Sequence, residues 1–465
     1  MMKNNQFNKN LLICGDNLKA LDDLKKLGIK ADLIYLDPPF FSNKQYEVVW
    51  GDEAEVRSFK DRWAGGINVY IEWMKERIIK MHDILKDDGS FYLHCDWHAG
   101  HYLKVMLDEV FGYRNFQNEI VWKRTYAHSD PSRCGRIHDI ILFYTKSETY
   151  IWNNIYQKPD PDYIDLFFDQ YDSARKERYS RLDLTAPKHG DGGNLLYEWK
   201  GIWPSKNRTW ACTKDKMEKL DKEGRIHYPK RGMPRQKRYE SEYKGTVLQD
   251  IWTDIRPMHN LSSERLGYPT QKPEALLERI IKASSNKDNL VLDPFCGCGT
   301  AMVVAQKLER KWIGIDISPT ALTVIERRLA KYGIIKNRNF DVIGMPTTLS
   351  ELRALEPFEF QNWVINEMRA KQSKKLVADM GLNGYYDKTI FTDSAGIQVK
   401  QSEKVGRNVI DNFETALKRA KYNTGFVVGF GFTKGAKEEV ARVKGKGLDI
   451  KLIRVEDLLL GKVKI

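Results

Sequence analysis

The sequence lacks the long apolar runs and the cysteine patterns that would place a protein in a membrane or in an oxidising compartment. No run approaches the roughly 18 apolar residues of a membrane span, and the start, MMKNNQFNKNLLICGD, contains no signal-peptide core. The 6 cysteines form neither a Cys-x-x-Cys pair nor a Cys/His set with zinc-ligand spacing. These absences predict a cytoplasmic protein without membrane contact, disulfides or a resident metal.

Acidic residues are too few to balance the basic ones. The formal net charge of +13 favours a polyanionic partner, although a basic surface can also serve solubility alone. The segment 225–238, RIHYPKRGMPRQKR, concentrates positive charge and contains no acid. Either it is a solvated loop or it binds the phosphates of a nucleic acid. Its basic residues are Arg225, Lys230, Arg231, Arg235, Lys237 and Arg238.

Internal repeats are also absent, and the 465 residues divide by pattern into four stretches. Strand-like and helix-like segments alternate at the start and again from about residue 268, which is typical of βαβ units. In the first stretch, apolar residues at three- and four-residue spacing from Tyr70 to Leu85 predict a helix that Gly89 ends. Between the alternating stretches lies charged, Trp-rich sequence that resembles an inserted recognition region. The predicted domains are 1–150, an insert at 151–255, 256–345 and 357–465.

The stretch LIYLDPPFFSN, residues 33–43, places an acid at the end of a buried strand. Four apolar residues run into Asp37 and two prolines. Ligands of open α/β sheets bind at the carboxyl ends of the strands. Asp37 is therefore a candidate functional residue. A strand followed by a proline turn would explain the prolines but not the position of the acid.

A second stretch, VLDPFCGCGTA at 291–301, has the outline of a nucleotide-type turn, although the full G-x-G-x-x-G pattern is missing. A strand leads into Gly297 and Gly299, and a helix is expected to begin near Thr300. The next strand ends at Asp316, where an acid can bind the two hydroxyls of a ribose. The pattern indicates a nucleoside cofactor, with a structural turn and a helix-capping acid as the alternative.

Three segments together resemble the amino-group DNA methyltransferases. LDPPF at 36–40, DPFCGCGT at 293–300 and YPTQKPEALLERII at 268–281 look like motifs IV, I and X of that family. The catalytic motif precedes the cofactor motif, and this permuted order resembles the β group. The resemblance covers roughly residues 10–330.

The resemblance implies an α/β fold with a doubly wound mixed sheet of the S-adenosylmethionine-dependent methyltransferase type. The motifs on this sheet would be circularly permuted, with 1–150 as the catalytic half and 256–345 as the cofactor-binding half. A target-recognition region would be inserted between the two halves, and a C-terminal α/β domain would follow.

The resemblance assigns the catalytic motif to Asp37, Pro38, Pro39 and Phe40. An exocyclic amino nitrogen is a poor nucleophile because its lone pair is delocalised into the ring. The Asp37 carboxylate and the Pro38 carbonyl would accept hydrogen bonds from its two N–H groups. These bonds would reduce delocalisation of the lone pair into the ring as the nitrogen attacks the methyl group. The prolines stiffen that carbonyl, and Phe40 stacks on a base flipped out of the duplex.

The resemblance also implies S-adenosylmethionine as the cofactor and assigns its contacts. Asp16 matches the acid that contacts the adenine, and Asp316 matches the ribose contact. Lys272 lies where the family places a carboxylate-binding segment, although a surface lysine before a helix would look the same. The motif that cradles the methionine half comprises Asp293, Phe295, Gly297, Gly299 and Thr300.

Within the family, DPPF rather than SPPY favours adenine N6 over cytosine N4 as the target. The implied substrate is double-stranded DNA, read by residues of about 125–265 that include the basic segment and Trp203 or Trp210. A cytosine-N4 enzyme, an RNA methyltransferase and a catalytically silent DNA-binding protein remain alternatives. A homodimer and a cognate restriction enzyme are partners expected at the level of the family only.

The segment 380–417 predicts a turn, a hairpin-like pair of strands and a helix. Its IQVK, with Gln398 and Lys400, resembles the Q-x-K half-motif of restriction-endonuclease-like domains of the Mrr type, which place a metal-binding acid before the preceding strand. The matching residue here is Asn383, a poorer magnesium ligand than Asp. A silent domain is therefore favoured over a nuclease, and a plain α/β accessory domain is the other alternative. The acids that could substitute are Asp379, Asp387 and Asp393.

Overall fold

The computed structural model describes residues 9–41, 66–126, 134–157, 161–258, 262, 264, 271–372, 382–387 and 393–463. The chain forms two compact units, one made of Met1–Asn153 with Asp250–Ile465 and the other of Asn154–Gln249. The first unit contains a large sheet and, later along the chain, a smaller C-terminal sheet. In the described part of the chain, no helix combines the length and the apolar character needed to cross a bilayer.

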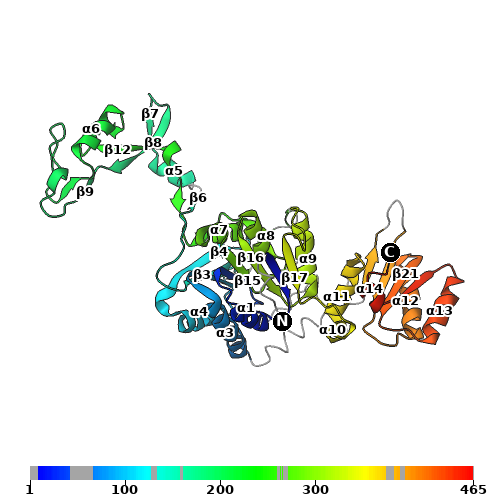
Figure 1. The fold of residues 1–465 in the computed structure, drawn as a ribbon. Coiled ribbons are helices and arrows are strands. Elements are labelled where there is room, and N and C mark those ends of the chain that lie inside the picture. The colour runs from blue at the N-terminus through cyan, green and yellow to red at the C-terminus, as the bar shows by residue number, and fades with distance from the viewer. Residues whose placement is uncertain are drawn as a thin grey trace. The chain divides into compact units, whose positions relative to one another are not determined.

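A mixed sheet forms the centre of the first unit, and nine of its strands lie in the described residues (Figure 1). From β3 to β17 all neighbouring strands are parallel, whereas β5 runs antiparallel to both β3 and β4. This mixed α/β sheet confirms the predicted fold class. In sheet order its strands are β14 (Ile251–Trp252), β4 (Phe116–Lys123), β5 (His138–Thr145), β3 (Leu85–Cys95), β2 (Ala31–Leu36), β15 (Leu290–Asp293), β16 (Lys311–Asp316), β1 (Asn10–Cys14) and β17 (Phe340–Ile343).

Helices lie on both faces of this sheet, which makes it doubly wound. In Figure 1, one group lies along one side and the other group along the opposite side. The side chains of Tyr70, Met74, Ile78 and Met81 are fully buried in the core of the first group, because residues three and four apart share one face of a helix. The first group is α1 (Asn17–Lys26), α3 (Ile67–Ile84) and α4 (Gly100–Phe111), and the second is α7 (Glu274–Ser284), α8 (Thr300–Lys307) and α9 (Pro319–Ala330).

Helix α3 ends earlier than the sequence predicts. It ends at Ile84, and Leu85 is already extended and pairs with Ala31 as the first residue of β3. Gly89 therefore does not end the helix. A Cβ atom there would lie 2.7 Å from Cδ1 of Leu85, so the glycine lets the irregular start of β3 fold against that side chain.

The unit Asn154–Gln249 has a small antiparallel sheet and its own apolar core. The core contains Trp199, Trp210 and Met217. The strands in sheet order are β11 (Ile226–His227), β12 (Arg235–Tyr239), β8 (Glu177–Asp183) and β7 (Gln170–Asp172). The other elements are β6 (Tyr156–Gln157), α5 (Pro161–Phe167), β9 (Thr185–Pro187), β10 (Arg208–Trp210), α6 (Lys214–Lys222) and β13 (Thr246–Val247).

The C-terminal sheet joins an antiparallel hairpin to a parallel half. Strand β19 is antiparallel to β20, whereas β20, β21 and β22 are parallel to one another. Apolar cores lie around Trp363 and around Phe413. In sheet order the strands are β18 (Lys371–Gln372), β19 (Gly384–Tyr386), β20 (Ala395–Val399), β21 (Thr424–Gly429) and β22 (Asp449–Arg454). The helices are α10 (Leu349–Ala354), α11 (Pro357–Glu367), α12 (Arg407–Ala420), α13 (Lys434–Lys444) and α14 (Val455–Leu459).

Candidate active site

Four acids that the sequence singled out lie at one edge of the large sheet. Asp37 follows β2, Asp293 and Asp316 end β15 and β16, and Asp16 follows β1 by two residues. These strands are parallel neighbours in the order β2-β15-β16-β1. Their carboxyl ends therefore lie at the same edge, where ligands bind in open α/β sheets. The fold thus brings together acids from two distant halves of the sequence.

Asp37 forms an ion pair with Lys272. Nζ of Lys272 lies 2.5 Å from Oδ2 of Asp37, and both side chains are largely buried. The same Nζ lies 5.3 Å from the centre of the Phe40 ring, so the lysine sits between the predicted catalytic acid and the predicted stacking ring. The pair places Lys272 beside the predicted catalytic acid.

Phe40 packs beside a buried histidine that no sequence motif indicated. The Phe40 and His94 rings lie 5.9 Å apart, and His94 also contacts the Tyr35 hydroxyl at 3.0 Å and the Asp139 carboxylate at 3.2 Å. Burial raises the pKa of Asp139, but the hydrogen bond to His94 and nearby positive charges outweigh burial and hold that pKa below its ordinary value. The available signal was a histidine within the apolar strand sequence FYLHC.

Asp293 and Asp316 hold the loop between β15 and α8. The Phe295 N–H donates to Asp293 at 3.0 Å, and the Gly297 and Ser318 N–H groups donate to the two oxygens of Asp316 at 2.8 and 2.9 Å. Burial raises the pKa of both acids, and that of Asp293 well above its ordinary range. Each carboxylate oxygen retains a second lone pair for a ligand.

The glycines of this loop have backbone conformations that favour glycine. Gly297 has φ +47° and Gly299 has φ +75°, in the left-handed region where a Cβ atom is costly. A Cβ atom at Gly299 would also lie 2.7 Å from Cγ1 of Ile325. Gly299 is the N-cap of α8, which begins at Thr300 as predicted, so the helix N-terminus with its free N–H groups faces this loop.

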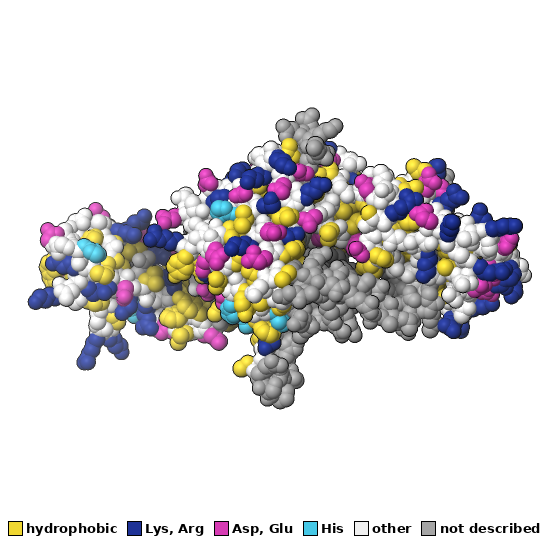
Figure 2. Space-filling model, turned by 90° about the horizontal axis from the view of Figure 1, so that it is seen from below, with side chains coloured by type: hydrophobic (Ala, Val, Ile, Leu, Met, Phe, Trp, Pro, Cys, Tyr) yellow, Lys and Arg dark blue, Asp and Glu magenta, His cyan; other side chains and the backbone are white. Residues whose placement is uncertain are grey.

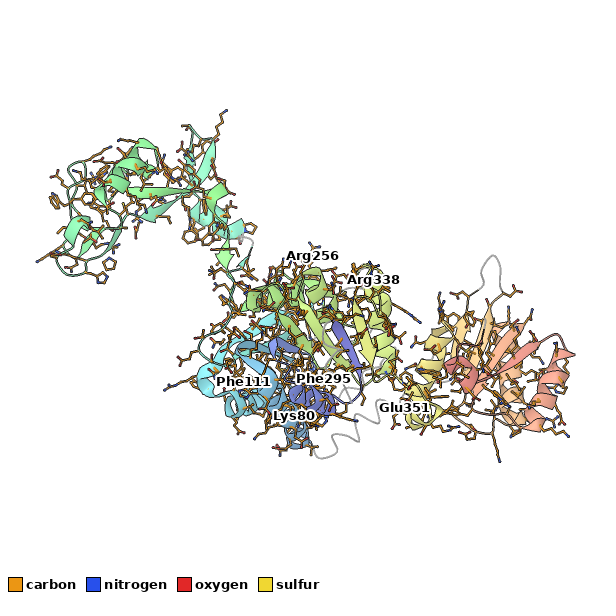
Figure 3. All side chains as sticks on the ribbon, viewed as in Figure 1. Lys80, Phe111, Arg256, Phe295, Arg338 and Glu351 are labelled. Atoms are coloured by element: carbon orange, nitrogen blue, oxygen red, sulfur yellow. The ribbon has the colours of Figure 1, made fainter. Side chains whose placement is uncertain are left out.

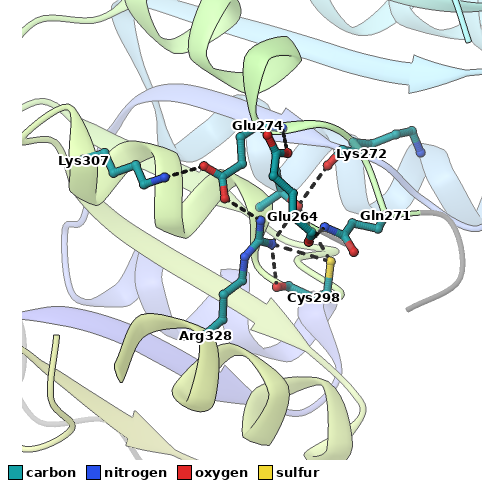
Figure 4. Close-up of polar contacts among 8 residues, drawn as sticks. Glu264, Gln271, Lys272, Glu274, Cys298, Lys307 and Arg328 are labelled. Carbon is teal, nitrogen blue, oxygen red and sulfur yellow. Dashed lines mark hydrogen bonds and ion pairs between the residues drawn. The ribbon is translucent and has the colours of Figure 1, made fainter. Parts of the chain in front are cut away.

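A buried arginine, which the sequence reading missed, holds the loop from the opposite side (Figure 4). The Arg328 guanidinium donates to the Cys298 carbonyl at 3.2 Å and to the Thr300 hydroxyl at 3.0 Å. Its charge is balanced by Glu274 at 2.8 Å, which also pairs with Lys307 at 2.5 Å. The available signal was an arginine on the apolar face of α9.

Asp16 and Phe295 lie beside α1 and α3. Asp16 caps α1 by accepting from the Leu18 N–H at 2.7 Å, and its other oxygen lies 3.2 Å from Arg77. The centre of the Phe295 ring lies 5.8 Å from that of the Trp73 ring, and Figure 3 labels Phe295 within the large sheet and its helices. The acceptors of Asp16 and Asp316 suit the amino and hydroxyl donors of a nucleoside, and the α8 N-terminus suits an anionic group. This set of residues therefore fits S-adenosylmethionine.

The basic segment of the insert divides into residues that bind other side chains of the insert and residues that make no ion pair in the described part of the chain. Arg225 pairs with Glu242, Arg235 with Asp183 and Lys237 with Asp172, while Arg238 donates to the Ser180 hydroxyl. Within the described residues, the exposed Lys230 and Arg231 make no ion pair. On the face that Figure 2 shows, lysine and arginine side chains are interleaved with acids.

The two tryptophans proposed to read bases have opposite environments. Trp203 is 55% exposed, whereas Trp210 is 0% exposed and donates its indole N–H to the Tyr197 carbonyl. The expectation that Trp210 could contact DNA is wrong, because this side chain belongs to the core of the insert.

Known proteins are similar to this chain over most of its length. A family model described as DNA methylase matches residues 31–327, and one described as restriction endonuclease matches 352–459. The type II methyltransferase M.EcaI of Enterobacter cloacae is 37% identical over 80% of this chain and 82% of its own. The type II methyltransferase M2.LlaDCHI of Lactococcus lactis subsp. cremoris is 41% identical over 70% and 91%.

Among solved structures, the M1.HpyAVI–SAM complex is 16% identical, with a TM-score of 0.35 over 69% of this chain and 100% of that one. The family assignment rests on the sequence matches, which extend over both halves of the large sheet. The chain therefore belongs to the DNA methylase family and is a DNA methyltransferase whose cofactor is S-adenosylmethionine.

Proposed function

We propose that the protein methylates the N6 amino group of adenine in double-stranded DNA, as an enzyme of the permuted β group. The observation that carries this proposal is the intact Asp37-Pro38-Pro39-Phe40 sequence at the carboxyl end of β2, beside the strand that leads into the glycine-containing loop. Asp37 in this motif, rather than a serine, favours adenine N6 over cytosine N4.

In the proposed reaction, the Asp37 carboxylate and the Pro38 carbonyl accept hydrogen bonds from the two N–H groups of the target amine. This geometry turns the nitrogen lone pair toward the methyl group. When bound, S-adenosylmethionine would supply that methyl from its sulfonium sulfur, which would keep the electron pair of the broken carbon–sulfur bond. The nitrogen would release one proton to the Asp37 carboxylate or to water as the new nitrogen–carbon bond forms. Phe40 stacks on the base once it has left the duplex, and its packing against His94 fixes the plane of the ring.

Lys272 acts on Asp37 before the target base arrives. With its Nζ 2.5 Å from Oδ2, the lysine holds the carboxylate in place. Oδ1 makes no hydrogen bond within the described residues and is proposed to receive the amino group. The role in binding the cofactor carboxylate, expected from the resemblance, requires Lys272 to exchange this partner. We propose both contacts for the same side chain.

The cofactor is proposed to bind along the edge formed by β15, β16 and β1. Asp16 contacts its adenine and Asp316 its ribose, while the motif Asp293–Thr300 cradles the methionine half. Arg328 shapes this loop without touching the cofactor, because its guanidinium bonds are made to Cys298, Thr300 and Glu274.

The insert is proposed to recognise the DNA. It is a separate compact unit with its own small core. This is expected of a recognition module inserted between the two halves of a catalytic sheet. The exposed Lys230 and Arg231, which make no ion pair within the described residues, are proposed to neutralise phosphates. Trp203 is exposed enough to meet a base.

Sequencing that detects modified bases, applied to DNA from cells that express the protein, tests the proposal. We expect N6-methyladenine at one recurring sequence, and none when the cells express Asp37→Ala. Purified Asp37→Ala should still bind S-adenosylmethionine, which shows that the variant is folded. N4-methylcytosine at the recurring sequence would reject the adenine assignment, and methylation of RNA but not DNA would reject the substrate.

A further inference from the structure

The C-terminal domain matches a family model described as restriction endonuclease, and the resemblance to such domains places a metal-binding acid before the strand that precedes Q-x-K. The hairpin of β19 and β20 shows which residues lie there in this chain. The Asn383 N–H donates to the Ile397 carbonyl, and the Val399 N–H donates to Oδ1 of Asn383 at 2.7 Å. Asn383 therefore lies directly opposite Gln398. This is the place, before β19 and beside the Q-x-K strand, where the resemblance expects a metal-binding acid.

Asn383 uses both halves of its amide to join α11 to β20. Because the Val399 N–H must meet an oxygen, Oδ1 faces the strand and Nδ2 faces α11, where it donates to Oε1 of Gln361 at 2.8 Å. An aspartate could accept from Val399 but could not donate to Gln361. Gln361 and Asn383 thus form a matched neutral pair.

Gln398 adds a third carboxamide. Its side chain is 6% exposed, and its Oε1 has no hydrogen-bond partner within the described residues. Two residues later, Lys400 is exposed at the end of β20. The position therefore offers neutral amides and one ammonium group.

Three described acids elsewhere in the domain are engaged with other partners. Asp387 pairs with Lys371, Glu403 with Arg353, and Glu359 accepts from the Ser318 hydroxyl. Asp379 lies outside the described residues. In the described part of the chain, one group of three acids lies close enough to share an ion, namely Asp411, Glu414 and Glu439 on α12 and α13. These acids already form ion pairs with Arg407, Lys418 and Arg442.

This donor set does not fit a divalent cation. Magnesium prefers carboxylate oxygens, which offset the cost of removing its water shell. Amide oxygens carry no net charge, and that of Asn383 already accepts a hydrogen bond from Val399. The positive charge of Lys400 would repel a cation, and no described carboxylate at this position would offset the repulsion. We infer that the C-terminal domain holds no divalent metal at this site and does not cleave DNA, so that the intact chain modifies DNA without cutting it. The inference does not depend on which base is methylated.

The test compares the full-length wild type with Asn383→Asp/Gln398→Glu, and Asn383→Ala serves as the matched control. Lys400→Ala and Asp379→Ala are made to trace any metal binding or cleavage that the wild type shows. Mn²⁺ binding is followed by electron paramagnetic resonance, and cleavage of plasmid DNA is assayed with Mg²⁺. Asp411→Asn/Glu414→Gln, made in each background, removes any ion held by the acids of α12 and α13. Methyl transfer and thermal unfolding report whether each variant is folded.

We expect the wild type and Asn383→Ala to bind no Mn²⁺ at this site and to leave plasmid intact, whereas Asn383→Asp/Gln398→Glu gains one bound ion. Magnesium-dependent cleavage by the wild type that is lost in Lys400→Ala would overturn the inference. Wild-type Mn²⁺ binding that is lost in Asn383→Ala or Asp379→Ala would also overturn it. If Asn383→Asp/Gln398→Glu folds but binds no ion, the argument from the donor set fails. If this variant does not fold, the inference is judged from the Mn²⁺ binding and DNA cleavage of the wild type.

Discussion

At the scale of single residues, Asp37 and Asp316 lie at the carboxyl ends of different strands. Their proposed roles, in methyl transfer and in cofactor binding, should be separable by mutation. Asp316→Ala should weaken binding of S-adenosylmethionine by roughly 1–3 kcal/mol, because hydroxyl groups of the cofactor would be left unpaired. Isothermal titration of the cofactor measures this loss. Asp37→Ala should not lose cofactor binding, because it removes a partner with which the cofactor carboxylate would compete for Lys272.

Asp316 also accepts from the Gly297 and Ser318 N–H groups, so the alanine variant removes a structural contact as well. Asp316→Asn keeps one acceptor oxygen and serves as the control. If both variants unfold at the wild-type temperature and bind the cofactor normally, Asp316 has no role as a ligand.

A second prediction at this scale concerns pH. Burial, and then the charges of Asp37 and Asp316, raise the pKa of Asp293 well above its ordinary value. The folded state therefore binds more protons than the unfolded state, so the stability contributed by Asp293 is present at low pH and is lost as the pH rises through the folded-state pKa. Asp293→Asn removes this titration and keeps the oxygen that accepts from Phe295.

Urea unfolding of the two proteins between about pH 5 and pH 8 measures the effect. We expect the free energy of unfolding of the wild type to fall relative to that of Asp293→Asn as the pH rises. A difference that stays constant across this range would show that Asp293 does not titrate in it.

At the scale of elements, the loop before β12 and the strand itself should respond differently to loss of charge. Lys230→Ala/Arg231→Ala should weaken DNA binding and reduce the slope of log K against log salt by about 2, since each phosphate contact contributes about 0.9. Lys237→Ala should instead lower the stability of the insert, because it leaves the largely buried Asp172 without its cation.

Fluorescence anisotropy of labelled duplex DNA at several salt concentrations measures the first effect, and thermal unfolding measures the second. Lys188→Ala, in the same insert but outside the basic segment, serves as the charge control. If Lys237→Ala changed the salt slope while stability stayed at the wild-type value, the assignment of Lys237 to an internal ion pair rather than to DNA binding would be wrong.

At the scale of the whole molecule, the methyltransferase and the C-terminal domain should be separable. Every residue of the candidate active site precedes residue 345, whereas Leu352 lies in the core of the C-terminal domain. A chain that ends before Thr347 should therefore keep methyl transfer. It should bind DNA more weakly and with less salt dependence, because it loses exposed lysines such as Lys400 and Lys404.

Methyl transfer to plasmid DNA and the salt dependence of DNA binding check this prediction. Equal affinity and equal salt slope in the long and short chains would mean that the C-terminal domain makes no contact with DNA.

The sequence by itself determined the features that depend on neighbouring residues. The apolar spacing in α3, the strand that ends at Asp37 and the glycine turn before Thr300 follow from local periodicity and backbone preference, and each is found in the structure. The order of the motifs along the chain is likewise a property of the sequence. The end of α3 was misplaced because Leu85 joins β3 through pairing with Ala31, a contact that periodicity does not report.

Only the tertiary structure decided which charged groups meet. Lys272 and Asp37 are 235 residues apart, Arg328 reaches Thr300 and Glu274 from another helix, and Lys237 turns inward while Lys230 stays exposed. Ion pairs and buried hydrogen bonds form where the packing of distant elements places complementary groups within about 3 Å. Such proximity is a property of the assembled sheets and helices, because a lysine or an arginine has the same local sequence signal whether it ends at a carboxylate or in water.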